Sequence, residues 1–237
     1  EEGWYKKALD TDLARPKFAI MNPEITYTLP DYQTQCGCAD IMMHTMERYF
    51  VLEDTMEITD KIAQDVMKNV MKYAKILKKD PENYEARAEI MWCGSLSHNG
   101  LTGCGTCGGD WATHLIEHEL GGMFDVAHGA GLAAVWGSWA RYVMDEKPER
   151  FAQFAVDVMG VEESDDVKST ALKGIEAVEE FYRMIEMPTN MKELGINPTD
   201  EQIKDMAMKA TNHDTQQLGA FKKLSAKDLV EIYKTAK

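Results

Sequence analysis

Apolar residues recur at steps of three and four along most of this chain, which is the pattern of amphipathic helices. The pattern is clearest over residues 59–78. One helical face there carries Ile62, Val66, Val70, Tyr73 and Leu77. The same reading predicts further helices over residues 40–50, 84–97, 111–121, 149–158 and 167–187.

Turn and capping residues mark where several helices begin and end. The glycine pair at 121–122 predicts the end of one helix. Thr199-x-x-Gln202 and Ser225-x-x-Asp228 resemble capping boxes, so we expect two more helices to open there. The sequence therefore predicts a mainly α fold of seven to nine helices.

The first thirty residues differ from the rest of the chain. Residues 17–23 and 25–30 are short, apolar and β-prone, and each stretch ends at a proline. Two strands with no others beside them cannot form a stable sheet. We therefore interpret residues 1–31 as a short β stub, the tail of a sheet whose other strands are missing, ahead of a helical domain over residues 32–237. Because the chain also lacks an initiating Met, we expect it to begin within a longer protein.

Composition narrows the possible partners and location. The 237 residues carry a net charge of −14, which repels phosphate backbones and argues against nucleic-acid binding. The longest uncharged apolar stretch, residues 129–140, is far shorter than the roughly 20 residues of a membrane span. An odd number of cysteines and no export signal predict a cytoplasmic protein with reduced thiols. The lone Cys104-x-x-Cys107 pair favours packing over a metal or redox role.

Candidate chemistry is concentrated in two segments. Asp40 and His44 form a D-x3-H pair, and His114, His118 and His128 form an H-x3-H-x9-H cluster. A spacing of four places two side chains on one helical face, so each pair can reach one ion. A carboxylate with several imidazoles suits a divalent transition metal held from at least two elements. Spacing does not separate the three clustered histidines, and hydrogen-bonded core histidines remain the alternative.

These segments resemble the iron-containing (group III) alcohol dehydrogenases, most closely their butanol dehydrogenase-like branch. The matching stretches include Y-Q-T-Q-C-G-C-A-D-I-M-M-H-T-M-E-R-Y-F, S-H-N-G-L, G-G-D-W-A-T-H-L-I-E-H-E-L and D-V-A-H-G-A-G-L-A. The resemblance implies an all-helical metal-binding domain of the dehydroquinate synthase-like type. It also implies that the β stub belongs to a Rossmann-like nucleotide-binding domain.

The resemblance assigns roles to the five candidate residues. One Asp and three His hold the metal in that family, which implies Asp40, His44, His114 and His128 as ligands. His118 is implied to lie near the nicotinamide and the substrate, where it is a candidate for proton relay and cofactor contact. The implied metal is Fe(II), with zinc possible, because an Asp/His3 set suits either.

The implied activity is NAD(P)-dependent interconversion of primary alcohols and aldehydes by metal-assisted hydride transfer. The family's G-G-G-S cofactor segment is missing, so we expect this chain to bind metal but to be inactive alone. A small alcohol or aldehyde is the expected substrate, and a homodimer is possible. One alternative is a metal-dependent hydrolase with Glu117 or Glu119 as base, although both are expected on the helix surface. The other is a helical module whose metal is structural or absent.

Overall fold

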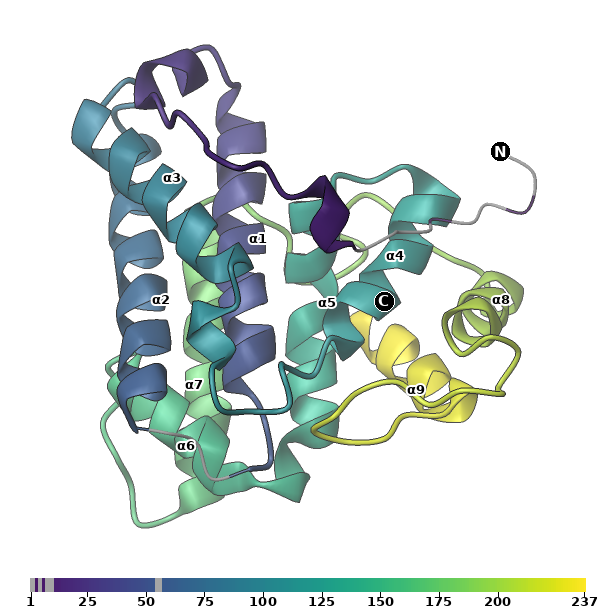
Figure 1. Cartoon of the computed structure of the whole chain (residues 1–237). Helices are drawn as coiled ribbons and strands as arrows, with labels where there is room; N and C mark the ends of the chain where they lie inside the picture. Colours follow the sequence, from purple (N-terminus) through teal and green to yellow (C-terminus); the bar gives the residue numbers. More distant parts are fainter. Residues whose placement is uncertain (1–2, 4–5, 7–10, 54–56) are drawn as a thin grey trace.

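The computed structural model describes residues 3, 6, 11–53 and 57–237, and these form a helical domain (Figure 1). The α-helices of this part of the chain are α1 (Asp31–Tyr49), α2 (Glu57–Leu77), α3 (Tyr84–His98), α4 (Ala112–Phe124), α5 (His128–Val143), α6 (Pro148–Asp157), α7 (Val167–Met184), α8 (Asp200–Ala210) and α9 (Ala226–Ala236). The short 3-10 helices η1 (Asp12–Ala14) and η2 (Pro23–Thr26) precede α1. The similar η3 (Leu101–Gly103) lies between α3 and α4, and η4 (Met144–Glu146) lies between α5 and α6. The predicted mainly α fold is confirmed. None of the helices described has both the length and the apolar composition that a bilayer crossing needs.

The β stub predicted within residues 1–31 does not form strands where the structure describes it. Residues 18–22 have no regular structure, and Pro23–Thr26 form η2. Phe18 and Ile20 are 81% and 87% exposed, so neither packs into a sheet. A strand needs a partner for its backbone groups, and the described residues supply none. Residues 1–2, 4–5 and 7–10 lie outside the described part, and the division at residue 31 stays a prediction.

Helix α1 lies at the centre of the domain. It contacts α2, α3 and α5, and Figure 1 shows α2 and α3 running beside it. Most positions of α1 are buried, including Gln35, Met42, Met43 and Glu47. The less buried face carries Gln33, Gly37, Asp40, His44 and Arg48, which follow one another at steps of three and four. Helix α1 therefore belongs to the core, and Asp40 and His44 lie on its one face that is not fully covered.

Helix α5 begins directly against α1. A Cβ atom on Gly129 would lie 2.0 Å from the carbonyl oxygen of Cys36, so only glycine permits this approach. Helix α5 also contacts α4, α7 and α9. The close contact at Gly129 fixes the preceding residue, His128, beside α1.

Helix boundaries match the prediction in part. Both predicted capping boxes are formed, and they open α8 and α9. The prediction that α4 ends at the glycine pair is wrong, because α4 continues to Phe124 and ends at Asp125, whose φ is 53°. Gly121 is instead a helical residue at a crowded point, where a Cβ atom would lie 3.1 Å from Oε1 of Glu117.

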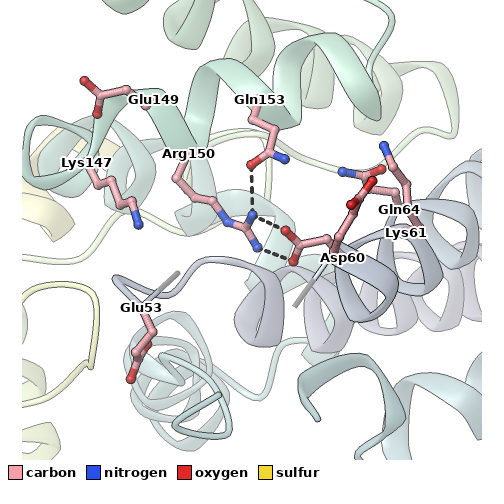
Figure 2. A pocket seen from close by; sticks show the side chains of 9 residues that line it. Glu53, Asp60, Lys61, Gln64, Lys147, Glu149, Arg150 and Gln153 are labelled. Atoms are coloured by element: carbon pink, nitrogen blue, oxygen red, sulfur yellow. Dashed lines mark hydrogen bonds and ion pairs between the residues drawn. The ribbon is translucent and has the colours of Figure 1, made fainter. Parts of the chain in front are cut away.

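A buried ion pair ties α6 to α2 (Figure 2). The Arg150 guanidinium donates to both carboxylate oxygens of Asp60, at 2.6 and 2.7 Å. It also donates to the carbonyl oxygen of Tyr49 at the end of α1. Both charged side chains are less than a tenth exposed. This one guanidinium therefore connects three helices.

Candidate functional site

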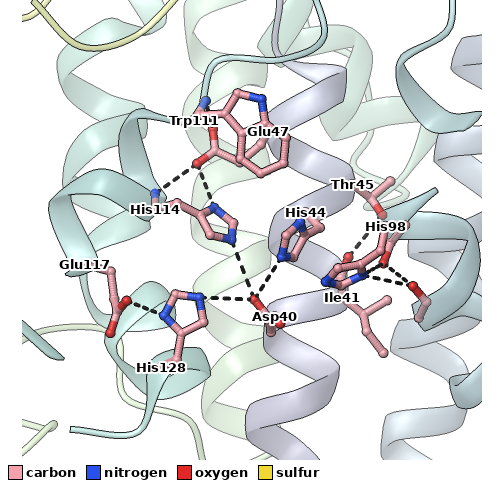
Figure 3. A network of polar contacts seen from close by, with 12 residues as sticks. Asp40, Ile41, His44, Thr45, Glu47, His98, Trp111, His114, Glu117 and His128 are labelled. Atoms are coloured by element: carbon pink, nitrogen blue, oxygen red, sulfur yellow. Dashed lines mark hydrogen bonds and ion pairs between the residues drawn. The ribbon is translucent and has the colours of Figure 1, made fainter. Parts of the chain in front are cut away.

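Three helices bring the predicted site residues together. Asp40 and His44 lie one turn apart on α1, His114 lies in the first turn of α4, and His128 is the first residue of α5 (Figure 3). Helical spacing explains the first pair. Tertiary packing supplies the other two residues, through the contacts of α5 with α1 and α4.

The three histidines converge on one carboxylate oxygen. The Oδ1 atom of Asp40 lies 3.5 Å from Nε2 of His44, 3.6 Å from Nε2 of His114 and 3.5 Å from Nε2 of His128. Four ligands placed tetrahedrally at about 2.1 Å from one ion lie roughly 3.4 Å apart. The three distances from Asp40 match those expected around a single ion. Ligand atoms of Asp40, His44 and His114 all lie within 4.8 Å of one another, whereas His128 falls in a second such group with Glu117 and His118.

Two of these atoms are otherwise unsatisfied. Oδ1 of Asp40 and Nε2 of His114 are buried and have no hydrogen-bond partner. Buried polar atoms in proteins are nearly always paired. One carboxylate and three imidazoles are also ligands that Fe(II) and Zn(II) accept. The residues present thus fit a divalent first-row metal.

The charges of the site favour a cation. Burial alone would raise the pKa of Asp40, but the nearby imidazoles of His114, His44 and His128 lower it overall. Burial likewise opposes the charged form of His114, but the nearby carboxylates of Asp40 and Glu47 raise its pKa to about 9. Burial lowers the pKa of His44 to about 3. Asp40 is thus held ionised, and positive charge beside it is stabilised.

Two buried glutamates contact the Nδ1 atoms of His114 and His128, on the side of each ring away from Asp40. Oε1 of Glu47 lies 3.1 Å from Nδ1 of His114, and Oε2 of Glu117 accepts a hydrogen bond from Nδ1 of His128. The expectation that Glu117 and Glu119 lie on the helix surface is wrong, because both are buried. Helix α4 is enclosed by α5 and α8, so it has little free surface on that side. Sequence reasoning missed Glu47, whose signal was its position one turn after His44.

His118 lies beside the cluster rather than within it. Its ring centroid is 5.6 Å from that of His128, and a nitrogen of each ring lies within 4.8 Å of a Glu117 oxygen. Burial, and next the charge of the nearby Lys6 ammonium, lower the pKa of His118 to about 4. His118 is therefore neutral near pH 7. Lys6 itself reaches the site, with Nζ 3.2 Å from Oε2 of Glu117.

Two aromatic side chains that sequence reasoning did not select line the His44 side. The His98 ring centroid lies 3.7 Å from that of His44. The Trp111 ring lies 5.5 Å from His44 and 5.3 Å from His114. His98 falls in the S-H-N-G-L stretch, which carried part of the family resemblance and was the available signal.

Comparison with known proteins identifies the family. Residues 34–237 match the family model described as Fe-containing alcohol dehydrogenase family, C-terminal. NADH-dependent butanol dehydrogenase A of Clostridium acetobutylicum is 34% identical over 230 residues, which are 97% of this chain and 58% of that protein. Probable NADH-dependent butanol dehydrogenase 1 of Bacillus subtilis is 36% identical, over 94% of this chain and 57% of its own length.

A solved structure agrees with these sequence matches. The crystal structure of NADH-dependent butanol dehydrogenase A from Thermotoga maritima has a TM-score of 0.91 at 33% identity. The match covers 99% of this chain and 60% of that one. The chain thus spans less than two thirds of the length of these relatives. It belongs to the Fe-containing alcohol dehydrogenase family, and it corresponds to that family's C-terminal helical domain.

Proposed function

We propose that Asp40, His44, His114 and His128 bind one divalent metal ion, and that this chain is the metal-binding half of an NAD(P)-dependent alcohol dehydrogenase. One observation carries the proposal: Nε2 atoms of three histidines lie 3.5 to 3.6 Å from a single buried oxygen of Asp40. The resident metal we propose is Fe(II), in keeping with the family, and the same ligand set accepts Zn(II). Residues 32–237 would form the metal-binding domain, and residues 1–31 the end of a nucleotide-binding domain.

The bound ion supplies Lewis acidity, which lowers the pKa of an alcohol or polarises an aldehyde carbonyl. The chain's own contribution is to orient the donors and to handle a proton. His118 is unprotonated near neutral pH and lies next to His128, so a ring nitrogen is free to accept a hydrogen bond from a substrate hydroxyl. We therefore propose His118 as the proton relay, in contact with the nicotinamide when the cofactor is present.

The full reaction we propose is interconversion of primary alcohols and aldehydes by hydride transfer to or from NAD(P). Support comes from the relatives, which are NADH-dependent butanol dehydrogenases. Because the chain spans about 58% of such a relative, we propose that these 237 residues bind metal but turn over no alcohol alone. NAD(P)-dependent oxidation of a primary alcohol by this chain without a partner would contradict that. A homodimer is proposed for the assembled enzyme.

The position of Glu117 argues against metal-dependent hydrolysis. A general base must reach a water on the metal, but the Glu117 carboxylate is fully buried and holds Nδ1 of His128. Glu119 is also buried, and its pKa is set by burial and by Lys209 and Asp205 rather than by the histidines. The dehydrogenase proposal therefore has more support than the hydrolase alternative.

Metal content of purified protein tests the proposal. We expect close to one equivalent of iron or zinc in the unaltered chain after reconstitution. Asp40→Ala and His128→Ala remove a ligand each, so both should lose most of that metal. His213→Ala is the control, because His213 is exposed, follows α8 and lies far in the sequence from the four proposed ligands. Metal retained in both ligand variants would rule out the site.

A further inference from the structure

Glu117 is a charged side chain in the interface between α4 and α5. Its side chain is fully buried, because α4 and α5 are in contact. Burying a carboxylate is costly unless it is paired and hydrogen-bonded. We therefore look for an interaction of Glu117 that offsets this cost.

Two glycines make the room that Glu117 occupies. A Cβ atom on Gly131 of α5 would lie 2.8 Å from Cγ and from Oε1 of Glu117. A Cβ atom on Gly121 of α4 would lie 3.1 Å from the same Oε1. Any other residue at Gly131 would displace the carboxylate, so the helix packing is shaped around this one side chain.

The Glu117 carboxylate contacts the ring nitrogen of His128 that does not face Asp40. Oε2 of Glu117 binds Nδ1 of His128, while Nε2 of the same ring faces Asp40 at 3.5 Å. The Lys6 ammonium, which can only donate, lies 3.3 Å from the same Nδ1, but the Glu117 contact is the shorter one. An ionised carboxylate only accepts hydrogen bonds, so the Glu117 contact needs the hydrogen on Nδ1. Nε2 then keeps its lone pair, which is the form that binds a metal.

We propose that Glu117 is a positioning residue that fixes the tautomer and orientation of His128 for metal binding. This inference rests on the metal centre proposed above. His128 has the most exposed side chain of the three histidines, at 32%, so it has the least packing to hold it. His114 has the equivalent partner in Glu47, whereas Nδ1 of His44 has none. The Lys6 ammonium at 3.2 Å balances the charge of Glu117.

Cobalt(II) affinity and absorption spectra test the inference. Glu117→Leu removes both the hydrogen bond and the charge, and Glu117→Gln keeps a carbonyl acceptor of the same size. Dissociation constants for Co(II) come from competition with a chromophoric chelator, and thermal unfolding of metal-free protein reports the fold. Glu119→Gln is the matched control, because Glu119 is buried on the same helix and the charges that act on its carboxyl are those of Lys209 and Asp205.

We expect Glu117→Leu to weaken Co(II) binding by about 10- to 100-fold and to shift the visible Co(II) bands. Glu117→Gln should fall between Glu117→Leu and the unaltered chain, and Glu119→Gln should match the unaltered chain. Equal affinity and spectra in Glu117→Gln, Glu117→Leu and the unaltered chain would overturn this inference alone. Failure of the unaltered chain to bind Co(II) would overturn the metal centre, and this inference with it. Loss of affinity in Glu119→Gln as large as in Glu117→Leu would show that the effect is not specific, and would also overturn it.

Discussion

Glu47 binds both the backbone and the ring of His114. Its Oε1 accepts the His114 backbone N–H at 3.0 Å and lies 3.1 Å from the ring Nδ1 (Figure 3). Its other oxygen accepts the backbone N–H of Trp111 at 2.7 Å. One buried carboxylate of α1 therefore caps the start of α4 and orients a proposed ligand at the same time.

Removing that carboxylate should cost stability even without metal. In Glu47→Ala, the N–H groups of Trp111 and His114 lose a partner in a buried place, so we expect a loss of about 2 to 4 kcal/mol in the free energy of unfolding. Urea unfolding of metal-free protein measures it. Glu149→Ala, at an exposed position in the first turn of α6, should cost less than about 1 kcal/mol. Equal losses in the two variants would contradict the double role of Glu47.

Metal should stabilise the folded chain by mass action. A ligand that binds only the native state adds about 2.7 kcal/mol at 100 times its dissociation constant. We expect Zn(II) or Fe(II) to raise the melting temperature, and a chelator to reverse the rise. His44→Ala should abolish most of the rise, whereas His213→Ala should keep it. An equal rise in melting temperature in His44→Ala would show that the metal binds at another site.

Breaking the buried Arg150–Asp60 pair should unfold the domain more readily. Arg150→Met leaves the Asp60 carboxylate buried without its bidentate partner, so we expect a loss of about 3 to 5 kcal/mol. Asp60→Leu combined with Arg150→Met removes both charges and should recover part of that loss. Denaturant unfolding of the two single variants and the double variant checks this. Additive losses in the double variant would show that the two side chains do not act as a pair.

Stability should depend on pH through Asp110. Burial, and next the charge of Glu47, raise the pKa of Asp110 from 3.8 to about 6, although backbone N–H groups of Phe221, Ala112 and Ala220 oppose the shift. Because the folded pKa is the higher one, the native state binds the extra proton. The stabilising contribution is thus full below about pH 4 and is lost as pH rises through about 6. The unfolding free energy of metal-free Asp110→Asn should fall less over this pH range than that of the unaltered chain, because Glu119, whose pKa burial raises to about 7, still contributes. An unchanged pH profile would contradict the assignment.

Two glycine substitutions should have opposite effects. Gly129→Ala puts a methyl group against the Cys36 carbonyl and should destabilise by about 3 kcal/mol or more, with weaker metal binding because His128 is adjacent. Gly37→Ala lies in α1, where nothing is within 4 Å of the added carbon. It should stabilise by about 0.5 to 1 kcal/mol. Thermal unfolding compares them, and similar shifts for both would refute the close contact.

Local patterns were enough to predict most of the helices and their caps. The stripe over residues 59–78 corresponds to α2, and both capping boxes are present. The glycine pair wrongly predicted the end of α4. Gly121 lies within the helix, at a point where a larger side chain would crowd the Glu117 carboxylate. The β prediction failed because strand formation depends on partners that a local pattern cannot supply.

Of the site, the sequence pattern could predict only which residues lie one helical turn apart. Spacing placed Asp40 beside His44, but nothing local could say that His128 lies 3.5 Å from Asp40 while His118 lies outside the set. That distinction came from the family resemblance. Glu47 and Glu117 read as ordinary charged helix residues, because burial of a carboxylate depends on the neighbouring helices.

The proposed ligands come from α1 (Asp31–Tyr49) and from the consecutive helices α4 and α5, which lie far along the chain from α1. During synthesis, Asp40 and His44 leave the ribosome long before His128 does. No partly made chain can assemble the full ligand set until α5 has docked on α1 at Gly129. Metal loading should therefore follow tertiary folding, and the ion would then act as a crosslink between α1 and the α4–α5 pair, which the chain itself connects only by way of α2 and α3.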